Sequence, residues 1–157
     1  MMSTPDISDK FSELPFLVGF NSYGAKSVFE GEVVTVVCPN DNSFAKELIS
    51  QKGNGKILFI DGNASKAVAL LGDNLAQQAL DNCWSGIVVN GMVRDVEILK
   101  TIPFPIYARG SCPKKSNKNN AGNINLDVCI DGVDIKPTFW AYGDENGILI
   151  SPTKLEL

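Results

Sequence analysis

Two short and almost wholly apolar runs, residues 56–60 (KILFI) and 86–90 (GIVVN), restrict the possible folds of this chain more than any other feature. A strand with one solvent-facing side alternates apolar and polar residues, whereas a strand covered on both faces is apolar along nearly its whole length. We therefore expect both runs to be buried central strands of a sheet.

The segments around these runs predict the other elements of an α/β layer. Residues 31–38 are rich in β-branched side chains and predict a strand, as do residues 106–108. Helical spacing of apolar residues predicts three helices: 43–51, 73–80 with Asp73 as N-cap, and one around Val96 and Leu99. The apolar run 67–71 fits either type of element. Strands and helices that alternate in this order indicate parallel crossovers.

Beyond residue 110 the pattern changes to short strands. Residues 111–123 are rich in Lys, Asn, Ser and Gly and predict an exposed loop. Three strand-like pieces follow, divided by turn signals: 124–130, 133–135 and 147–151. Residues 1–12 are polar, and we expect them to be frayed or lightly docked. We thus predict an α/β fold: a single compact domain over residues 1–157, with a mixed central sheet, flanking helices and β-rich ends.

The chain contains no histidine, and this excludes several kinds of site. Ser–His and Cys–His nucleophile pairs are impossible, as are histidine-ligated zinc and iron centres. A formal net charge of −4 argues against a direct nucleic-acid binder, which needs a concentrated positive face. Any chemistry must use carboxylates, arginine, lysine, thiols, backbone amides or a metal held by oxygen.

Four widely spaced cysteines, Cys38, Cys83, Cys112 and Cys129, form no C-x-x-C pair. Two disulfides are formally possible in a secreted chain, but the N-terminus has no basic region followed by an apolar one. No apolar run approaches the roughly 20 residues of a membrane span. We interpret the cysteines as small buried hydrophobes of a protein in the reducing cytoplasm.

Two segments carry residues suited to ligand binding. Gly72 precedes the predicted helix start, where free amides could cradle a carboxylate or phosphate; the alternative is an ordinary N-cap. Arg94 and Asp95 follow a buried strand, where Arg94 could grip a carboxylate and Asp95 a hard divalent cation; the alternative is a solvated pair in a first helical turn.

Each of these two segments opens a helix after a β-type segment, so both could meet at one edge of the sheet. An amide cradle, an arginine and a metal-binding aspartate together would suit a small 2-oxo acid, whose enolate a metal could stabilise as a Lewis acid. The Lys114–Lys118 run could bind phosphate or RNA, but we expect it to be a solvated loop.

The run LGDNLAQQALDNCWSGIVVNGMVRDVEILK (71–100) resembles the signature of the family called regulator of ribonuclease E activity A. This family includes the metal-dependent 4-hydroxy-4-methyl-2-oxoglutarate aldolases. The similarity continues through EGEVVTVVCPNDN, KGNGKILFIDG, the CPKKS loop and WAYGDENGILIS. It implies a fold of the swivelling β/β/α type and a homotrimer.

The resemblance also implies roles for particular residues. In the family's aldolases, backbone around the Gly-Asp segment and the arginine hold the pyruvoyl part of the substrate. Those positions match Gly72, Asp73, Asn74, Leu75 and Arg94 here. Asp95 matches the aspartate of the Mg²⁺ or Mn²⁺ site, so Arg94 and Asp95 are the expected catalytic residues. Such enzymes cleave 4-hydroxy-4-methyl-2-oxoglutarate to two pyruvates and decarboxylate oxaloacetate through a metal-stabilised pyruvate enolate.

A second function is also implied by the resemblance: a non-catalytic regulator that binds and masks an RNA-degrading endoribonuclease. Members with that role can lack the metal aspartate, whereas Asp95 is present here. Two departures bear on catalysis. Ile98 stands where the aldolases carry an acidic residue, with Glu97 one position earlier, and the glycine-rich turn 62–67 lacks the family's arginine.

Overall fold

Four parallel strands form the centre of a ten-stranded sheet: β3 (Phe29–Val37), β4 (Ile57–Asp61), β6 (Gly86–Val93) and β7 (Ile106–Ser111). The computed structural model describes residues 1–157. Every residue of β6 and the first four of β4 are buried, so the prediction of central strands covered on both faces is confirmed. The ambiguous apolar run becomes β5 (Ala69–Leu71), a strand parallel to β6.

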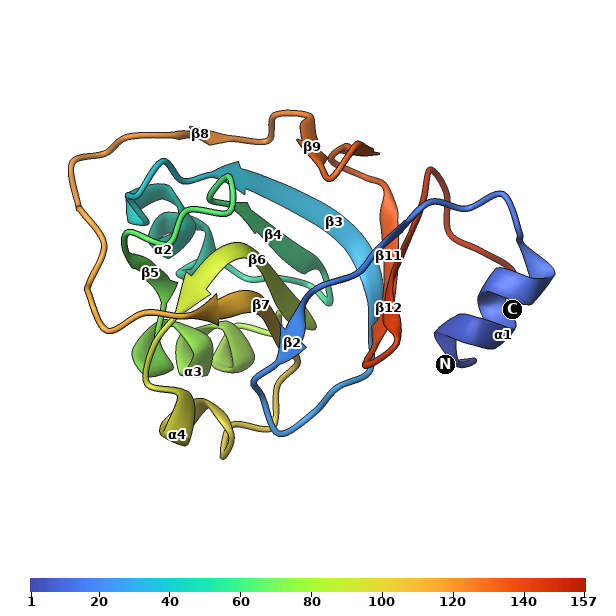
Figure 1. Cartoon of the computed structure of the whole chain (residues 1–157), viewed down its shortest axis with the longest axis horizontal. Helices are drawn as coiled ribbons and strands as arrows, with labels where there is room; N and C mark the ends of the chain where they lie inside the picture. The colour runs from blue at the N-terminus through green and yellow to red at the C-terminus, as the bar shows by residue number, and fades with distance from the viewer.

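The helices cover one face of the parallel strands. Figure 1 shows α2 (Ser43–Ile49), α3 (Asp73–Asp81) and α4 (Val96–Leu99) together on one side of the sheet. Leu48, Ala76 and Leu99 pack from these helices into a core of 21 buried residues that includes Ile60 and Val89 of the central strands. The predicted helices are therefore confirmed, although α4 has only four residues.

Short strands cover the opposite face. β3 pairs in parallel with β4 through residues 33–37 and antiparallel with β11 (Trp140–Asp144) through residues 29–32, so the sheet is mixed as predicted. β11 continues to β12 (Gly147–Ser151) and β1 (Phe16–Leu17). These strands and the β9–β10 hairpin (Val128–Ile130, Val133–Ile135) enclose a second core of 13 residues. The result is one compact α/β domain with β, β and α layers.

Two predictions about the strands need correction. The strand expected over 124–130 is interrupted: β8 (Asn123–Ile124) pairs with β3, Asn125 has a positive φ of 61°, and β9 begins only at Val128. β11 was not predicted, because its sequence WAYGD contains both a glycine and a charged residue. β2 (Asn21–Ser22) closes the other edge of the sheet against β7.

Of the two alternatives expected for the first residues, frayed or lightly docked, the structure shows a docked segment. They form α1 (Thr4–Lys10), which Figure 1 shows beside β11 and β12. The amide of Thr4 donates to Asp144 at 2.8 Å and its hydroxyl donates to the same carboxylate at 2.6 Å. Ile7 is completely buried against Tyr142 and Leu149. The helix is therefore fastened to the sheet by both polar and apolar contacts.

The cysteines only partly follow the prediction. All four are free thiols, but only Cys38 is buried; Cys112 is half-buried, and Cys83 and Cys129 are exposed. Burial raises the pKa of the Cys38 thiol to about 12, so this side chain is a packed, un-ionised group of the core. None of the helices combines the length and apolar character that crossing a bilayer requires.

Candidate functional site

The two segments singled out by sequence lie side by side. Leu71 ends β5 and Val93 ends β6, and the two residues are paired in the sheet. The amide of Arg94 donates to the carbonyl of Leu71 at 3.0 Å. Gly72 and Arg94 therefore follow neighbouring parallel strands at their carboxyl ends, the edge at which α/β sheets bind ligands.

A polar hollow of about 140 Å³ lies at this edge. Its walls include all six predicted site residues: Gly72, Asp73, Asn74, Leu75, Arg94 and Asp95. The other six lining residues are Asn42, Ala69, Leu71, Lys115, Ser116 and Lys118. The structure thus brings the predicted residues together and adds side chains from two further segments.

The start of α3 differs from the prediction in one respect. Gly72, not Asp73, is the N-cap, and Asp73 is the first helical residue. Because the N-cap is a glycine, it has no side chain that could accept a hydrogen bond from the helix amides. Instead the carboxylate of Asp95 lies against this end, where its Oδ2 accepts a long hydrogen bond of 3.4 Å from the amide of Asp73. The negative carboxylate therefore faces the positive end of the α3 dipole.

Close approach explains the glycine at position 72. A Cβ on Gly72 would lie 2.7 Å from Oδ2 of Asp95 and 3.6 Å from Cγ of Arg94. The φ of Gly72 is −133°, which any residue can adopt, so backbone freedom is not the reason. The absent side chain leaves room for Asp95 to reach the helix end.

Asp95 has a left-handed backbone, with φ 60° and ψ 40°. Aspartate tolerates this region better than most residues, at a cost of roughly 1–3 kcal/mol that surrounding contacts must offset. The carbonyl of Asp95 accepts amides from Ile98 and Leu99, each at 2.9 Å, which fixes the residue at the start of α4.

The guanidinium of Arg94 has donors to spare. It is half-buried, and its one hydrogen bond to the protein is a long one, from Nη1 to the carbonyl of Pro113 at 3.4 Å. The two ion pairs of the structure join Lys56 to Glu32 and Arg109 to Asp131, so Arg94 pairs with no carboxylate, including that of Asp95. Arg94 is therefore free to bind a carboxylate of a ligand.

Asn42 is a lining residue that the sequence reasoning missed. Its side chain is 7% exposed, and its Nδ2 donates to the carbonyl of Leu70 at 3.1 Å. Its Oδ1 is buried and has no hydrogen-bond partner. A buried polar atom without a partner is uncommon, because losing water without replacement costs free energy. No sequence signal identifies Asn42, since its place beside α3 depends on the packing of α2.

Hydrogen bonds from its backbone hold the loop that carries Lys115 and Lys118, and the composition of the loop does not predict them. The amide of Asn117 donates to the carbonyl of Asn40 at 2.9 Å, and that of Asn119 to Oδ2 of buried Asp41 at 2.5 Å. Burial opposes ionisation of Asp41, but hydrogen bonds from Ser43 and the loop amides hold its pKa below the ordinary value. The loop predicted to be exposed thus has mostly exposed side chains, apart from buried Ser116, and a backbone held by hydrogen bonds.

The two departures from the aldolase pattern lie outside this hollow. Ile98 is 42% exposed, whereas Glu97 lines a neighbouring hollow of about 210 Å³ with Arg94, Asp95 and Cys112. Residues 62–67 do not line the polar hollow. Glu97 therefore shares a surface with the Arg94–Asp95 pair, although it does not share the hollow beside Gly72.

The oxygen donors around the hollow suit a hard cation. Asp73, Asp95 and Asn42 belong to its lining. No group of three or more His, Cys, Asp or Glu residues is gathered anywhere in the chain. Mg²⁺ needs only one or two carboxylates because it keeps several waters or shares oxygens with a substrate. The residues present fit such a cation.

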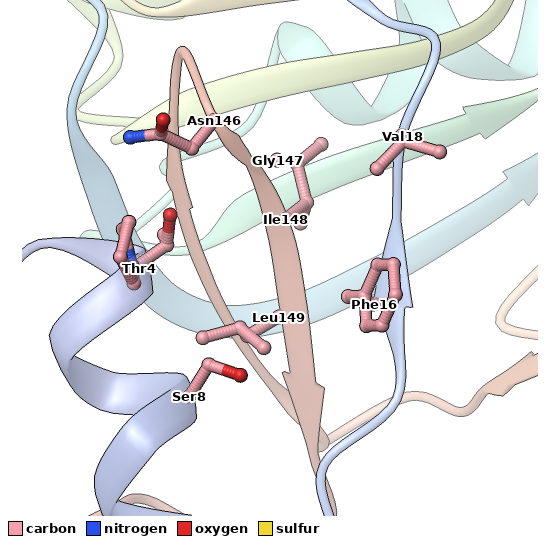
Figure 2. Close-up of a pocket in the computed structure, with 9 residues that line it drawn as sticks. Thr4, Ser8, Phe16, Val18, Asn146, Gly147, Ile148 and Leu149 are labelled. Atoms are coloured by element: carbon pink, nitrogen blue, oxygen red, sulfur yellow. The ribbon is translucent and has the colours of Figure 1, made fainter. Parts of the chain in front are cut away.

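Another hollow, of about 210 Å³, lies between α1, β1 and β12 (Figure 2). Its lining contains no charged side chain: Thr4, Pro5, Ser8, Phe16, Val18, Asn146, Gly147, Ile148 and Leu149. Figure 2 shows Phe16 and Val18 on one side of β12 and Thr4 and Ser8 of α1 on the other. This hollow lacks groups for acid–base or anion chemistry, so the polar hollow is the candidate site.

Known proteins resemble the chain over almost its whole length. A model of the RraA-like family (Aldolase/RraA) matches residues 4–150. A Hahella chejuensis protein named "Putative 4-hydroxy-4-methyl-2-oxoglutarate aldolase" is 42% identical over 156 residues, 98% of this chain and 95% of that protein. A Photobacterium profundum protein of the same name is 45% identical over 157 residues, with the same two coverages.

A solved structure gives the same result for the fold. The RNA-processing inhibitor RraA from Thermus thermophilis superposes with a TM-score of 0.96 at 36% identity, over 99% of this chain and 96% of that one. The family inferred from residues 71–100 is thus confirmed by sequence and by structure. The chain belongs to the RraA-like family of aldolases and RraA proteins.

Proposed function

We propose that this protein is a divalent-metal-dependent lyase that acts on 2-oxo acids: an aldolase for 4-hydroxy-4-methyl-2-oxoglutarate that also decarboxylates oxaloacetate. The observation that supports this most is the free guanidinium of Arg94 in one hollow with the α3 helix end and Asp95. The names of the relatives agree with this proposal.

Arg94 and the start of α3 provide the binding contacts in this proposal. The guanidinium binds the carboxylate next to the 2-oxo group through two parallel hydrogen bonds, each worth roughly 1.5–3 kcal/mol for charged partners. The 2-oxo oxygen then faces the first amides of α3, at residues Gly72 to Leu75. Negative charge grows on this oxygen as the carbon–carbon bond breaks, and the positive end of the helix stabilises it.

Asp95, with Asp73 as a further oxygen donor, would hold Mg²⁺ or Mn²⁺, which would supply Lewis-acid stabilisation of the same developing charge. Gly72 contributes by its small size, because it allows the Asp95 carboxylate and the α3 amides to face the same point. Arg94 orients the substrate carboxylate. Its guanidinium lines the hollow together with Asp95, directly after the end of β6.

A coupled assay of pyruvate release tests this function. With Mg²⁺ present, the wild-type protein should release pyruvate from both 4-hydroxy-4-methyl-2-oxoglutarate and oxaloacetate. Arg94→Ala should reduce kcat/KM at least 100-fold, which corresponds to the loss of one bidentate contact. Lys52→Gln is a matched control, because Lys52 is an exposed cation before β4 at the opposite edge of the sheet. A wild-type protein without activity, or an Arg94→Ala variant with full activity, would contradict the proposal.

The likeness to the RNA-processing inhibitor favours a second candidate function, a regulator that binds an endoribonuclease. Purified protein added in stoichiometric amounts to an RNase E-type cleavage assay tests this. Inhibition that persists in Arg94→Ala would indicate a masking surface separate from the polar hollow. We also propose a homotrimer in the cytoplasm, which light scattering would detect as a mass of three 16.9 kDa chains.

A further inference from the structure

We propose that Asn146 is a site of spontaneous deamidation, and that its conversion to aspartate or isoaspartate releases α1 from the sheet. Asn146 precedes Gly147 in the turn between β11 and β12, and it lines the hollow that Figure 2 shows beside α1. Neither residue lines the polar hollow, so this inference is independent of the proposed function.

The reaction needs only an asparagine, the backbone nitrogen of the next residue, and water. Once hydroxide has removed its proton, the nitrogen of Gly147 attacks Cγ of Asn146. The bond from Cγ to Nδ2 then breaks, and Nδ2 leaves as ammonia with a proton from water. One water molecule opens the resulting succinimide ring at either carbonyl, which gives aspartate or isoaspartate. Glycine hinders the attack least, because it has no Cβ.

Exposure distinguishes Asn146 from a buried pair of the same sequence. Asn146 is exposed, whereas Asn90 and Gly91 are buried in β6. Both ends of the Asn90 amide are bonded: Nδ2 donates to Asp61 and Oδ1 accepts from Arg109, each at 3.0 Å. Ring closure at Asn90 would have to break these bonds and distort a central strand, so we expect Asn90 to stay intact.

The side chain of Asn146 helps to hold the carboxylate that fastens α1. Its Nδ2 donates to Oδ1 of Asp144 at 3.2 Å, and its backbone amide donates to the same oxygen at 2.9 Å. That oxygen also accepts the hydroxyl of Thr4 at 2.6 Å, while Oδ2 accepts the amide of Thr4 at 2.8 Å. Deamidation replaces the Nδ2 donor with a carboxylate, so two negative groups would face each other where a hydrogen bond now stands.

The helix depends strongly on this anchor. Only Thr4 and Ile7 among its seven residues are buried, and a free helix needs roughly 12–15 residues to persist in water. Isoaspartate adds a second disturbance, because it lengthens the main chain of the two-residue turn that closes the pairing of Asp144 with Gly147. Both products should therefore loosen the docking of α1.

Peptide mapping by mass spectrometry tests the modification on full-length protein aged at mildly alkaline pH. The peptide that contains Asn146 should become one mass unit heavier and separate into aspartate and isoaspartate forms, while the peptide that contains Asn90 stays unmodified. Asn146→Gln should convert at least about 10-fold more slowly, because its side chain would have to close a larger ring. An Asn146 that stays intact while a synthetic peptide of residues 141–150 converts would overturn the proposal.

Hydrogen exchange tests the consequence for α1. The amides of Ile7 and Phe11, which donate to the carbonyls of Ser3 and Ile7, should exchange at least about 10-fold faster in Asn146→Asp than in wild type. Asn54→Asp is the matched control, since it adds the same charge at the other exposed Asn-Gly pair and should leave these rates unchanged.

Aged wild-type protein should show the same acceleration in its converted fraction, and aged Asn146→Gln should keep the rates of its fresh sample. Exchange in Asn146→Asp at the wild-type rate, or an equal acceleration in Asn54→Asp, would contradict the link between this site and α1.

Discussion

Nη2 of Arg109 lies 2.6 Å from Oδ2 of Asp131, an ion pair that joins β7 to the turn between β9 and β10. The two partners differ in surroundings: the Arg109 side chain is 16% exposed and that of Asp131 is 59% exposed. Arg109 also donates from Nε to Oδ1 of Asn90 at 3.0 Å and from Nη1 to the carbonyl of Val18 at 2.9 Å. Its guanidinium lies 3.9 Å from the centroid of the Phe20 ring.

Arg109 should therefore matter far more for stability than its ionic partner. Arg109→Ala removes hydrogen bonds to three segments and leaves Oδ1 of Asn90 without its donor, so we expect a loss of about 2–4 kcal/mol in the free energy of unfolding. Asp131→Ala breaks only a solvent-screened contact and should cost about 0–1 kcal/mol. Urea unfolding of the two variants measures both values, and equal losses would show that the ion pair itself is the main contribution.

The contrast between α1 and the central strands shows which parts of the fold the sequence can and cannot predict. Unbroken apolar runs identified β4 and β6 because burial on both faces leaves a local pattern. α1 left no such pattern: of its seven residues only Thr4 and Ile7 are buried, and its anchor Asp144 lies 140 positions away in the sequence. Contacts of that range do not appear in local periodicity.

The same distinction applies to the candidate site. Gly72 and Arg94 stand next to helix starts, so chain-local reasoning located them at the carboxyl ends of strands. Lys115 and Lys118 lie at the hollow because amides of their loop are bonded to Asn40 and Asp41, more than 70 residues earlier in the chain. Its composition predicts a solvated loop, since Lys, Asn, Ser and Gly dominate residues 111–123.

Cys83 offers a test of backbone strain. It follows α3 with a φ of 64°, and the amides of Cys83 and Trp84 donate to Leu80 and Ala79 in the pattern of a Schellman cap. Glycine is favoured at this position, so Cys83→Gly should raise the free energy of unfolding by roughly 0.5–1 kcal/mol. Cys83→Ala also removes the thiol but keeps the strain, and it should give no such gain. Thermal unfolding of both variants distinguishes backbone relief from loss of the thiol.

Asp144 makes the docking of α1 dependent on pH. Burial opposes ionisation, but hydrogen bonds from Thr4 and Asn146 hold the pKa of Asp144 below its ordinary value of 3.8. The unfolded chain therefore takes up the proton first, and the stabilisation is complete above pH 3.8 and lost as the pH falls through the lower folded pKa. Asp144→Ala should lower Tm at pH 7, and the difference from wild type should shrink at pH values below 3.8. Asp134→Ala, which removes an exposed carboxyl group, is the control. A Tm difference between Asp144→Ala and wild type that does not change with pH would contradict this linkage.

Asp41 should control the order of the lysine loop. One carboxylate oxygen accepts the amide of Ser43 at 2.9 Å and the other accepts that of Asn119 at 2.5 Å. Asp41→Asn has nearly the same shape but turns an NH₂ group toward one of these amides, so one hydrogen bond must break. Hydrogen exchange of amides 115–121 should accelerate about 10-fold or more, which corresponds to roughly 1.4 kcal/mol. Exchange rates that match those of wild type would indicate that other contacts hold the loop.

Gly72 provides the sharpest test of the arrangement at the site. A Cβ there would lie 2.7 Å from Oδ2 of Asp95, so Gly72→Ala must displace this carboxylate, whereas the φ of −133° accommodates alanine without strain. We expect Tm to change by less than about 3 °C. Under the proposed function, kcat/KM for pyruvate release should decrease at least 100-fold, because the Asp95 carboxylate and the α3 amides would no longer face one point. Because the damage acts through Asp95, Gly72→Ala should add little to the loss in an Asp95→Ala background. Additive losses in the double variant would mean that Gly72 acts on the substrate independently of that carboxylate.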